Sequence, residues 1–143
     1  MVEILIPVRP TGKRLLCINT GCGFQKIKSS EQQEWINIDC SETVKPDIVS
    51  DLDYGFSHEI LDNSVDVIYA NHFIEHLWLP LDFLANCWRK LSLGGVLYIK
   101  CPNGALISHP CHKGFFSEAW FSILDPAHPE HYEIRDAISG KCE

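Results

Sequence analysis

Short apolar runs separated by turn residues mark out much of the chain. They occupy residues 15–18, 35–38, 47–49, 65–70 and 96–101. Runs of this length, rich in Val, Ile and Tyr and bounded by Gly, Asp, Asn or Pro, are typical of buried strands in a parallel sheet. We therefore predict a strand at each of these positions.

Helical periodicity is clearest just before the last of these runs and predicts a helix over residues 81–91. The apolar positions expected to face inward are Leu81, Leu84, Ala85, Trp88 and Leu91. The pair Gly94-Gly95 would end this helix, because glycine adopts the positive φ that the turn into the next strand requires. A second helix is predicted to start at Ser117, turn Phe121 and Leu124 inward and end before Pro126.

The alternation of strands and helices predicts an α/β fold with an open, mostly parallel, doubly wound sheet. The connection over residues 24–34 is polar and short, so we expect its helix to be short or irregular. After residue 103 only residues 132–134 suggest another strand, and the sheet is therefore expected to be shortened at its C-terminal end. The length of 143 residues fits one domain over residues 1–143.

Composition narrows the partners and the compartment. The net charge is -7, and Lys and Arg form no basic run, which argues against a nucleic-acid partner. The seven cysteines are irregularly spaced without a CxxC pair, which argues against a zinc ribbon and favours a reducing compartment. No apolar stretch approaches the roughly 20 residues that span a bilayer, so we expect a cytoplasmic protein without a membrane segment.

Polar and small residues follow the predicted strands one after another. Gly21 and Gly23 follow the first, Asp39 ends the second, and the pairs 51–52, 71–72 and 102–103 end the others. The carboxyl ends of parallel strands are where such sheets bind ligands, and a carboxylate there can accept hydrogen bonds from a ribose diol. Each feature alone has a plain explanation as a tight turn or cap, but the series favours a nucleotide-type cofactor.

Other cofactor motifs fit less well. A dinucleotide site would need the pattern GxGxxG, which fails because Gln25 and Lys26 follow Gly23. A P-loop is excluded because neither GKS nor GKT occurs in the chain.

Several segments together resemble the small type-11-like class I methyltransferases that depend on S-adenosylmethionine (SAM). The matching segments, in that family's order and spacing, are LLCINTGCG, WINIDCS, KPDIVSDLD, LDNSVDVIYANHFIEHL and CWRKLSLGGVLYIKCPN. The resemblance implies a Rossmann-like fold and SAM as cofactor. Many class I enzymes have an acidic residue where this chain has Asn19, and their sheet normally has seven strands, more than are predicted here.

The resemblance also implies roles for matching residues. The methionine end of SAM would lie near Asn71 and His72 and near the turn formed by Asn19, Thr20, Gly21, Cys22 and Gly23. Asp39 would hold the ribose, with Cys40 near the adenine, and Asp51 and Leu52 would line the adenine. If the acceptor must lose a proton, His72 is the first candidate for the base and His109 the second.

The histidines allow other interpretations. His72, Glu75 and His76 form an inverted zinc-protease pattern, although the same residues match the methyltransferase segment, where His76 would be a structural hydrogen-bonding residue. His109, Cys111 and His112 could bind a metal or simply form a loop on the substrate side. Because no ligand distant in sequence can be assigned to them, we predict no metal site. The indole rings of Trp78, Trp88 and Trp120 are expected in the core.

The resulting prediction is a SAM-dependent methyltransferase that acts on a small-molecule acceptor. The alternative is a SAM-binding or SAM-fold module without transferase activity, such as a partner subunit or a degenerate remnant. A sheet that ends early would leave an open edge, through which a homodimer could form.

Overall fold

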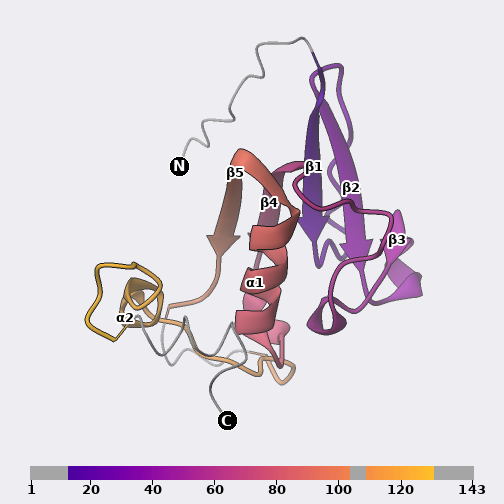
Figure 1. Cartoon of the computed structure of the whole chain (residues 1–143). Coiled ribbons are helices and arrows are strands. Elements are labelled where there is room, and N and C mark those ends of the chain that lie inside the picture. Colours follow the sequence, from indigo (N-terminus) through magenta and orange to yellow (C-terminus); the bar gives the residue numbers. More distant parts are fainter. Residues whose placement is uncertain (1–12, 104–108, 131–143) are drawn as a thin grey trace.

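The computed structural model describes residues 13–103 and 109–130 and contains a five-stranded sheet in which all neighbouring strands are parallel. The strand order is β3-β2-β1-β4-β5 (Figure 1). The strands are β1 (Leu15–Thr20), β2 (Gln33–Asp39), β3 (Ile48–Val49), β4 (Val65–Asn71) and β5 (Leu91–Lys100). All five predicted strands are confirmed, and the α/β prediction with them. The strand suggested at residues 132–134 lies outside the described residues.

The strand order reverses between β1 and β4, as it does in doubly wound sheets. Asn19 near the end of β1 is in register with Asn37 of β2 and with Tyr69 of β4. The carboxyl ends of these three strands therefore lie side by side. In Figure 1 the arrowheads of β1, β2 and β5 point to the same end of the sheet. The reversal opens a crevice at this end, which is where ligands bind in such folds.

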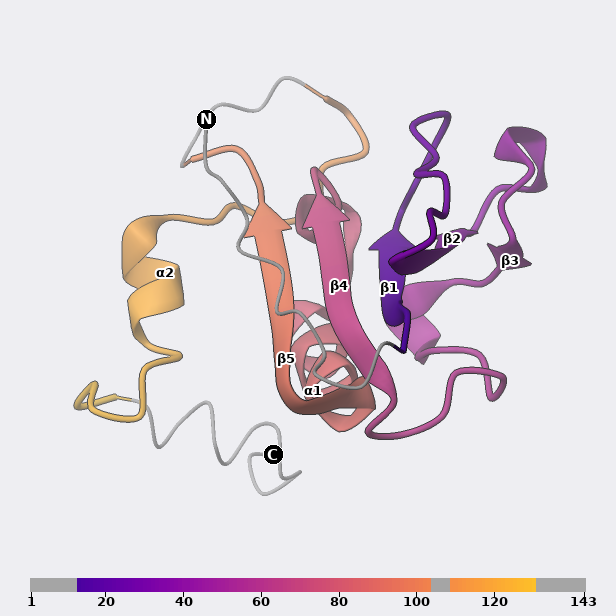
Figure 2. The ribbon, with the colours of Figure 1, turned by 90° about the horizontal axis from the view of Figure 1, so that it is seen from above.

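The single long helix of the described residues, α1 (Pro80–Lys90), packs against one face of the sheet (Figures 1 and 2). Phe83 and Cys87 are its fully buried apolar residues, whereas Trp88 is 83% exposed. Of the predicted inward face, Leu84 and Leu91 do pack against the main core, but the prediction for Trp88 is wrong. The Phe83 ring sets the rotation of the helix, because it stacks on Phe56 and meets Phe73 edge to face.

The tryptophan predictions have mixed outcomes. Trp88 and Trp78 are largely exposed, so their assignment to the core is wrong. Trp120 does pack against the main core.

The predicted helix stop at Gly94-Gly95 is also wrong. Helix α1 ends at Lys90, and β5 begins at the next residue. Gly94 does adopt positive φ, but inside β5, where the register against β4 is irregular. Since Leu91 pairs with Val65 and Val96 with Val67, the extra residues between them form a bulge in β5.

The remaining connections are short. Single 3-10 turns occur at η1 (Glu42–Val44), η2 (Leu52–Tyr54) and η3 (Ile74–His76). Residues 24–34 hold no helix, whereas a short or irregular one was predicted there. Helix α2 (Glu118–Ser122) starts after the cap Ser117, at the predicted position, and lies beyond β5 (Figure 2). None of the described helices has the length and apolar character needed to cross a membrane.

The two faces of the sheet carry cores of unequal size. The α1 side holds the main cluster, which includes Ile18, Ile38 and Ile68. The opposite face holds a small cluster of Leu15, Cys17 and Val67, packed against Trp35. Neighbouring residues of β1 and of β4 belong to opposite clusters, because successive side chains of a strand point to opposite faces of the sheet.

Candidate active site

A cleft of about 400 Å³ lies at the carboxyl ends of the strands. Its walls come from the ends of β1 and β2, the turn after β3, the segment after β4 and the loop before α2. The residues that line it are Gly21, Asp39, Cys40, Ser50, Asp51, Leu52, Asp53, His72, Phe73, His76, Leu77, Trp78, Cys111 and Lys113. A neighbouring hollow of about 300 Å³ shares Gly21 and is further lined by Asn19, Cys22, Gln25, Lys26, Ile27, Tyr69 and Asn71.

Most residues predicted to bind a cofactor line one of these two spaces. The exceptions are Thr20 and Gly23. Thr20 is buried, and its hydroxyl donates a hydrogen bond to the backbone carbonyl of Tyr69 at 3.0 Å. Thr20 thus joins β1 to β4 rather than facing either space.

Asp39 holds the turn that follows β1. Its Oδ2 accepts a hydrogen bond from the backbone N–H of Gly23 at 2.9 Å, and its Oδ1 accepts one from Ser41 at 2.9 Å. Each carboxylate oxygen can accept a further bond, so Asp39 can still receive donors from the cleft. Next to it, burial and the charges of Asp39 and Asp51 raise the pKa of the Cys40 thiol.

Asp51 caps the 3-10 turn η2. Its Oδ1 accepts a hydrogen bond from the backbone N–H of Asp53 at 3.0 Å, and the following Leu52 is buried in the main core. The capping bond fixes this carboxylate at the rim of the cleft, beside Asp39 and Cys40.

The two glycines of the turn differ in what requires them. Both have positive φ, of 56° at Gly21 and 51° at Gly23. A Cβ on Gly21 would lie 2.1 Å from Cδ2 of Phe73, whereas one on Gly23 would meet no atom within 4 Å. Gly21 is therefore needed for packing against Phe73, a role that the sequence analysis did not assign to it.

The helix-free segment after the glycine turn is held by a network of amides. Asn37 Oδ1 accepts hydrogen bonds from Asn19 Nδ2 at 3.0 Å and from the Ile27 N–H at 2.8 Å. Asn37 Nδ2 donates to the Ile27 carbonyl at 3.0 Å and to Asp47 Oδ2 at 2.9 Å. Asn19 also donates to the Gln25 carbonyl at 3.1 Å, so it supports one wall of the hollow through its neighbours.

Two buried polar side chains beside the cleft and the hollow have oxygen atoms without a hydrogen bond. Asn71 Oδ1, next to the hollow, and both carboxylate oxygens of Glu75 have no hydrogen bond in the described part of the chain. Such orphaned groups are rare and point to a bound partner or a functional role. Glu75 Oε1 lies 3.4 Å from Nδ1 of His72, which lines the cleft and adopts the left-handed φ of 49° that non-glycine residues seldom adopt.

The second candidate base, His109, stands apart from His72. It is exposed and does not line the cleft, but its ring centroid lies 5.7 Å from that of His76, which does. The ring of His76 forms no hydrogen bond with the described residues, in contrast to the structural role expected for it. Burial lowers the pKa of His76, and the nearby His112, His109 and Lys113 lower it further, although Glu75 acts in the opposite direction.

Sequence analysis missed Glu75, Phe73 and Lys113 as parts of this region. Glu75 was considered only within a zinc-protease pattern, and no local signal reveals that it is buried. The sequence did contain a signal for Phe73. It is a large apolar residue just after the end of β4, and Gly21, which has no side chain, follows the end of the neighbouring strand β1 and leaves space for its ring.

The strand order and the polar cleft at the strand ends define a Rossmann-like α/β domain. The sequence profile of the methyltransferase domain family matches residues 18–99, which include the second half of β1, all of β2, β3, β4 and α1, and nearly all of β5. The chain belongs to this family, the class I SAM-dependent methyltransferases.

A curated relative supports the same family. A protein of Mycolicibacterium smegmatis (strain ATCC 700084 / mc(2)155), described as a probable S-adenosylmethionine-dependent methyltransferase, is 45% identical over 42 residues. The match covers 29% of this chain and 16% of that protein. The chain thus corresponds to a small part of that relative's length.

Proposed function

We propose that this chain binds SAM in the cleft and adjoining hollow and transfers its methyl group to a small-molecule acceptor. The observation that carries the proposal is the anchored carboxylate of Asp39, which shares the cleft with Gly21, Asp51 and Leu52. A carboxylate at this strand end suits the two hydroxyl groups of a ribose.

The other lining residues fit the remaining parts of SAM. Cys40, Asp51 and Leu52 would contact the adenine, with the Asp51 carboxylate toward its amino group. Asn71 would serve the methionine end, because its buried Oδ1 lacks a donor that an ammonium group can supply. The backbone of the turn through Gly21 and Cys22 would lie along the same end.

Methyl transfer requires little covalent chemistry from the protein, since bound SAM supplies a methyl group on a positively charged sulfur. The residues of the chain align the acceptor and exclude water. For an acceptor that must lose a proton, His72 is the proposed base. The Glu75 carboxylate, whose Oε1 lies 3.4 Å from its Nδ1, would orient the ring. His109 remains the second candidate.

The binding experiment is a calorimetric and thermal-shift titration with SAM, S-adenosylhomocysteine and NAD in parallel. Ligand at 100 times its Kd should add roughly 2.7 kcal/mol of stability. We expect both adenosyl ligands, but not NAD, to bind. Asp39→Asn should weaken SAM binding at least about tenfold, as expected for a lost hydrogen bond to a charged group, whereas Asp82→Asn on the exposed start of α1 should not change it. Equal affinity in both variants would overturn the assignment of the cleft.

The activity experiment measures transfer of labelled methyl to a panel of small hydroxyl, amine and thiol acceptors. His72→Ala should retain SAM affinity but lose about a hundredfold or more in kcat with a hydroxyl acceptor, which is the scale of general-base catalysis. Full turnover with unchanged SAM affinity would exclude His72 as the base.

A second candidate function is a SAM-binding module without its own activity. This is the alternative that the sequence leaves open, and among the described residues β5 forms one edge of the sheet. SAM binding without methyl transfer to any acceptor would favour this candidate. Pairing of a second copy along the β5 edge would produce a homodimer, which sedimentation would detect.

The compartment is part of the same proposal. The six cysteines within the described residues are free thiols, which suits a reducing environment such as the cytoplasm. The acidic net charge of -7 favours a small acceptor over a nucleic acid.

A further inference from the structure

Three histidines from two distant segments meet beside the cleft. His76 belongs to the turn η3, whereas His109 and His112 lie in the loop before α2. One ring nitrogen from each lies within 4.8 Å of the others. The ring centroids are 4.8 Å apart for His76 and His112, and 5.4 Å apart for His109 and His112.

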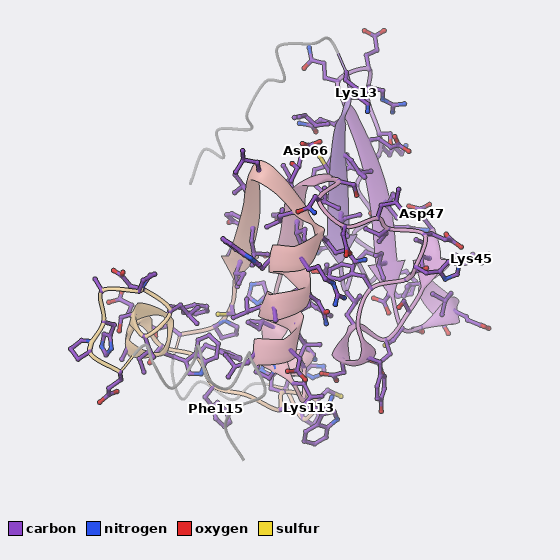
Figure 3. The ribbon with its side chains drawn as sticks, in the orientation of Figure 1. Lys13, Lys45, Asp47, Asp66, Lys113 and Phe115 are labelled. Carbon is purple, nitrogen blue, oxygen red and sulfur yellow. The ribbon has the colours of Figure 1, made fainter. Side chains whose placement is uncertain are left out.

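Backbone bonds hold the loop against η3. The carbonyl of Glu75 accepts hydrogen bonds from the N–H of Lys113 at 2.7 Å and of Gly114 at 3.3 Å. The Lys113 ammonium donates to the carbonyl of His76 at 3.0 Å, and Lys113 lies near the carboxyl ends of the strands (Figure 3). These bonds fix the two segments together, so the meeting of the rings is built into the fold.

A buried carboxylate stands behind the cluster. The Glu75 side chain is 2% exposed and its oxygens have no hydrogen bond with the described residues. Its Oε1 lies 4.0 Å from Nε2 of His112, itself only 10% exposed. Histidine ligands of metals usually donate their other ring N–H to a carboxylate or carbonyl, which fixes the ring and strengthens the ligand. The orphaned Glu75 is placed to play this part for His112.

We propose that His76, His109 and His112 bind a divalent transition-metal ion of the Zn²⁺ type, with Glu75 orienting His112. Three imidazoles suit zinc and its neighbours in the first transition row, and three protein ligands leave a fourth position open. Since His76 also lines the cleft, that position would be available to water or to a group bound there. The proposal is independent of SAM binding.

The geometry requires small adjustments. Zinc binds imidazole nitrogen at about 2.0–2.1 Å, so the three nitrogens would have to draw together by about an ångström. His109 would give up the hydrogen bond that its Nδ1 accepts from the Cys111 N–H at 3.1 Å. This bond is exposed, so water can replace it.

From the sequence we predict no metal site, because no metal ligand distant in sequence can be assigned to His109 and His112. The tertiary structure supplies that partner in His76. The local pattern of His72, Glu75 and His76 had suggested a different pair, but His72 is absent from the cluster and faces Glu75 instead.

The test uses the full chain, freed of metal with a chelator, and titrates it with Co²⁺ and Zn²⁺. Co²⁺ should bind in a one-to-one ratio and give visible bands of a low-symmetry imidazole site without a thiolate charge-transfer band. His109→Ala and His112→Ala should each weaken Zn²⁺ binding at least tenfold. Glu75→Gln should weaken it about tenfold, as loss of such an orienting group does. His58→Ala, at an exposed position outside the cluster, is the matched control.

Two outcomes would overturn the proposal: no binding of either ion, or binding that keeps a thiolate band and is equal in the two histidine variants. The second outcome would assign the metal to cysteines. Thermal melts of each variant verify that it folds, and a SAM titration of the same samples separates this result from the proposed function. Loss of Zn²⁺ binding with retained SAM binding supports a distinct metal site.

Discussion

Removal of the Asn37 side chain tests whether amide bonds replace the missing first crossover helix. In Asn37→Ala, the N–H and carbonyl of Ile27, the Asn19 amide and an Asp47 oxygen each lose a partner at 2.8–3.0 Å. Asn37 is only 5% exposed, and its side chain lies between β1 and the segment after the glycine turn. Water therefore replaces these bonds incompletely.

The expected loss follows from the cost of each bond. A typical hydrogen bond contributes about 1 kcal/mol net, and an orphaned buried group costs about 1–3 kcal/mol. Ile27 is partly exposed and Asp47 is exposed, so these two recover much of their hydration. We expect Asn37→Ala to lower the free energy of unfolding by about 2–3 kcal/mol.

Urea unfolding followed by tryptophan fluorescence measures this loss. The midpoint should fall while the m value stays constant, since the exposed surface of unfolding changes little. Asn86→Ala is the matched control, because Asn86 accepts one exposed bond from Arg89 at 2.8 Å, and it should change stability by less than about 0.5 kcal/mol. Equal midpoints for the two variants would refute the structural role of the network. SAM affinity should fall with Asn37→Ala, since the hollow is lined by the segment that Asn37 holds.

Three further predictions concern the turn, a thiol and an ion pair. Gly21→Ala should destabilise the fold by about 2 kcal/mol or more, because the left-handed φ and the Phe73 ring both oppose a Cβ; unfolding curves equal to the wild type would contradict this. The Cys40 thiol is exposed in the cleft, and alkylation followed by mass spectrometry should slow when SAM saturates the protein. An unchanged rate, with binding verified by calorimetry, would place SAM elsewhere. The Lys90 ammonium donates to Asp62 at 2.8 Å and lowers the pKa of that carboxyl, so the unfolded chain binds the proton more readily. The stabilisation is complete above the ordinary carboxyl pKa of about 4 and is lost as the pH falls below it. Asp62→Asn should therefore reduce the loss of stability in acid, and equal pH profiles for variant and wild type would contradict this.

The sequence contains enough local information for the sheet and for part of the site. The strands could be located because β-branched and aromatic runs end at turn residues, a pattern confined to neighbouring positions. Asp39 and Asp51 could be predicted as site residues because each lies at the end of one of these runs. In a parallel sheet, every strand brings its carboxyl end to one edge, so order along the chain converts into proximity in space.

The rotation of α1 depended on contacts that no local pattern contains. The apolar spacing predicted a face that included Trp88. Phe83 became the buried residue because Phe56 and Phe73, from other parts of the chain, surround it. With Phe83 turned toward the core, the side chain of Trp88 is left exposed to solvent.

The sequence by itself determined the strands, the short polar connection after the glycine turn and the row of polar residues at the strand ends. Only the tertiary structure decided that Gly21 makes room for Phe73, that Asn37 holds the segment after the turn and that His76 meets His109 and His112. Each of these depends on side chains that approach from separate segments. Such contacts are set by strand register and helix rotation, which a single sequence does not encode locally.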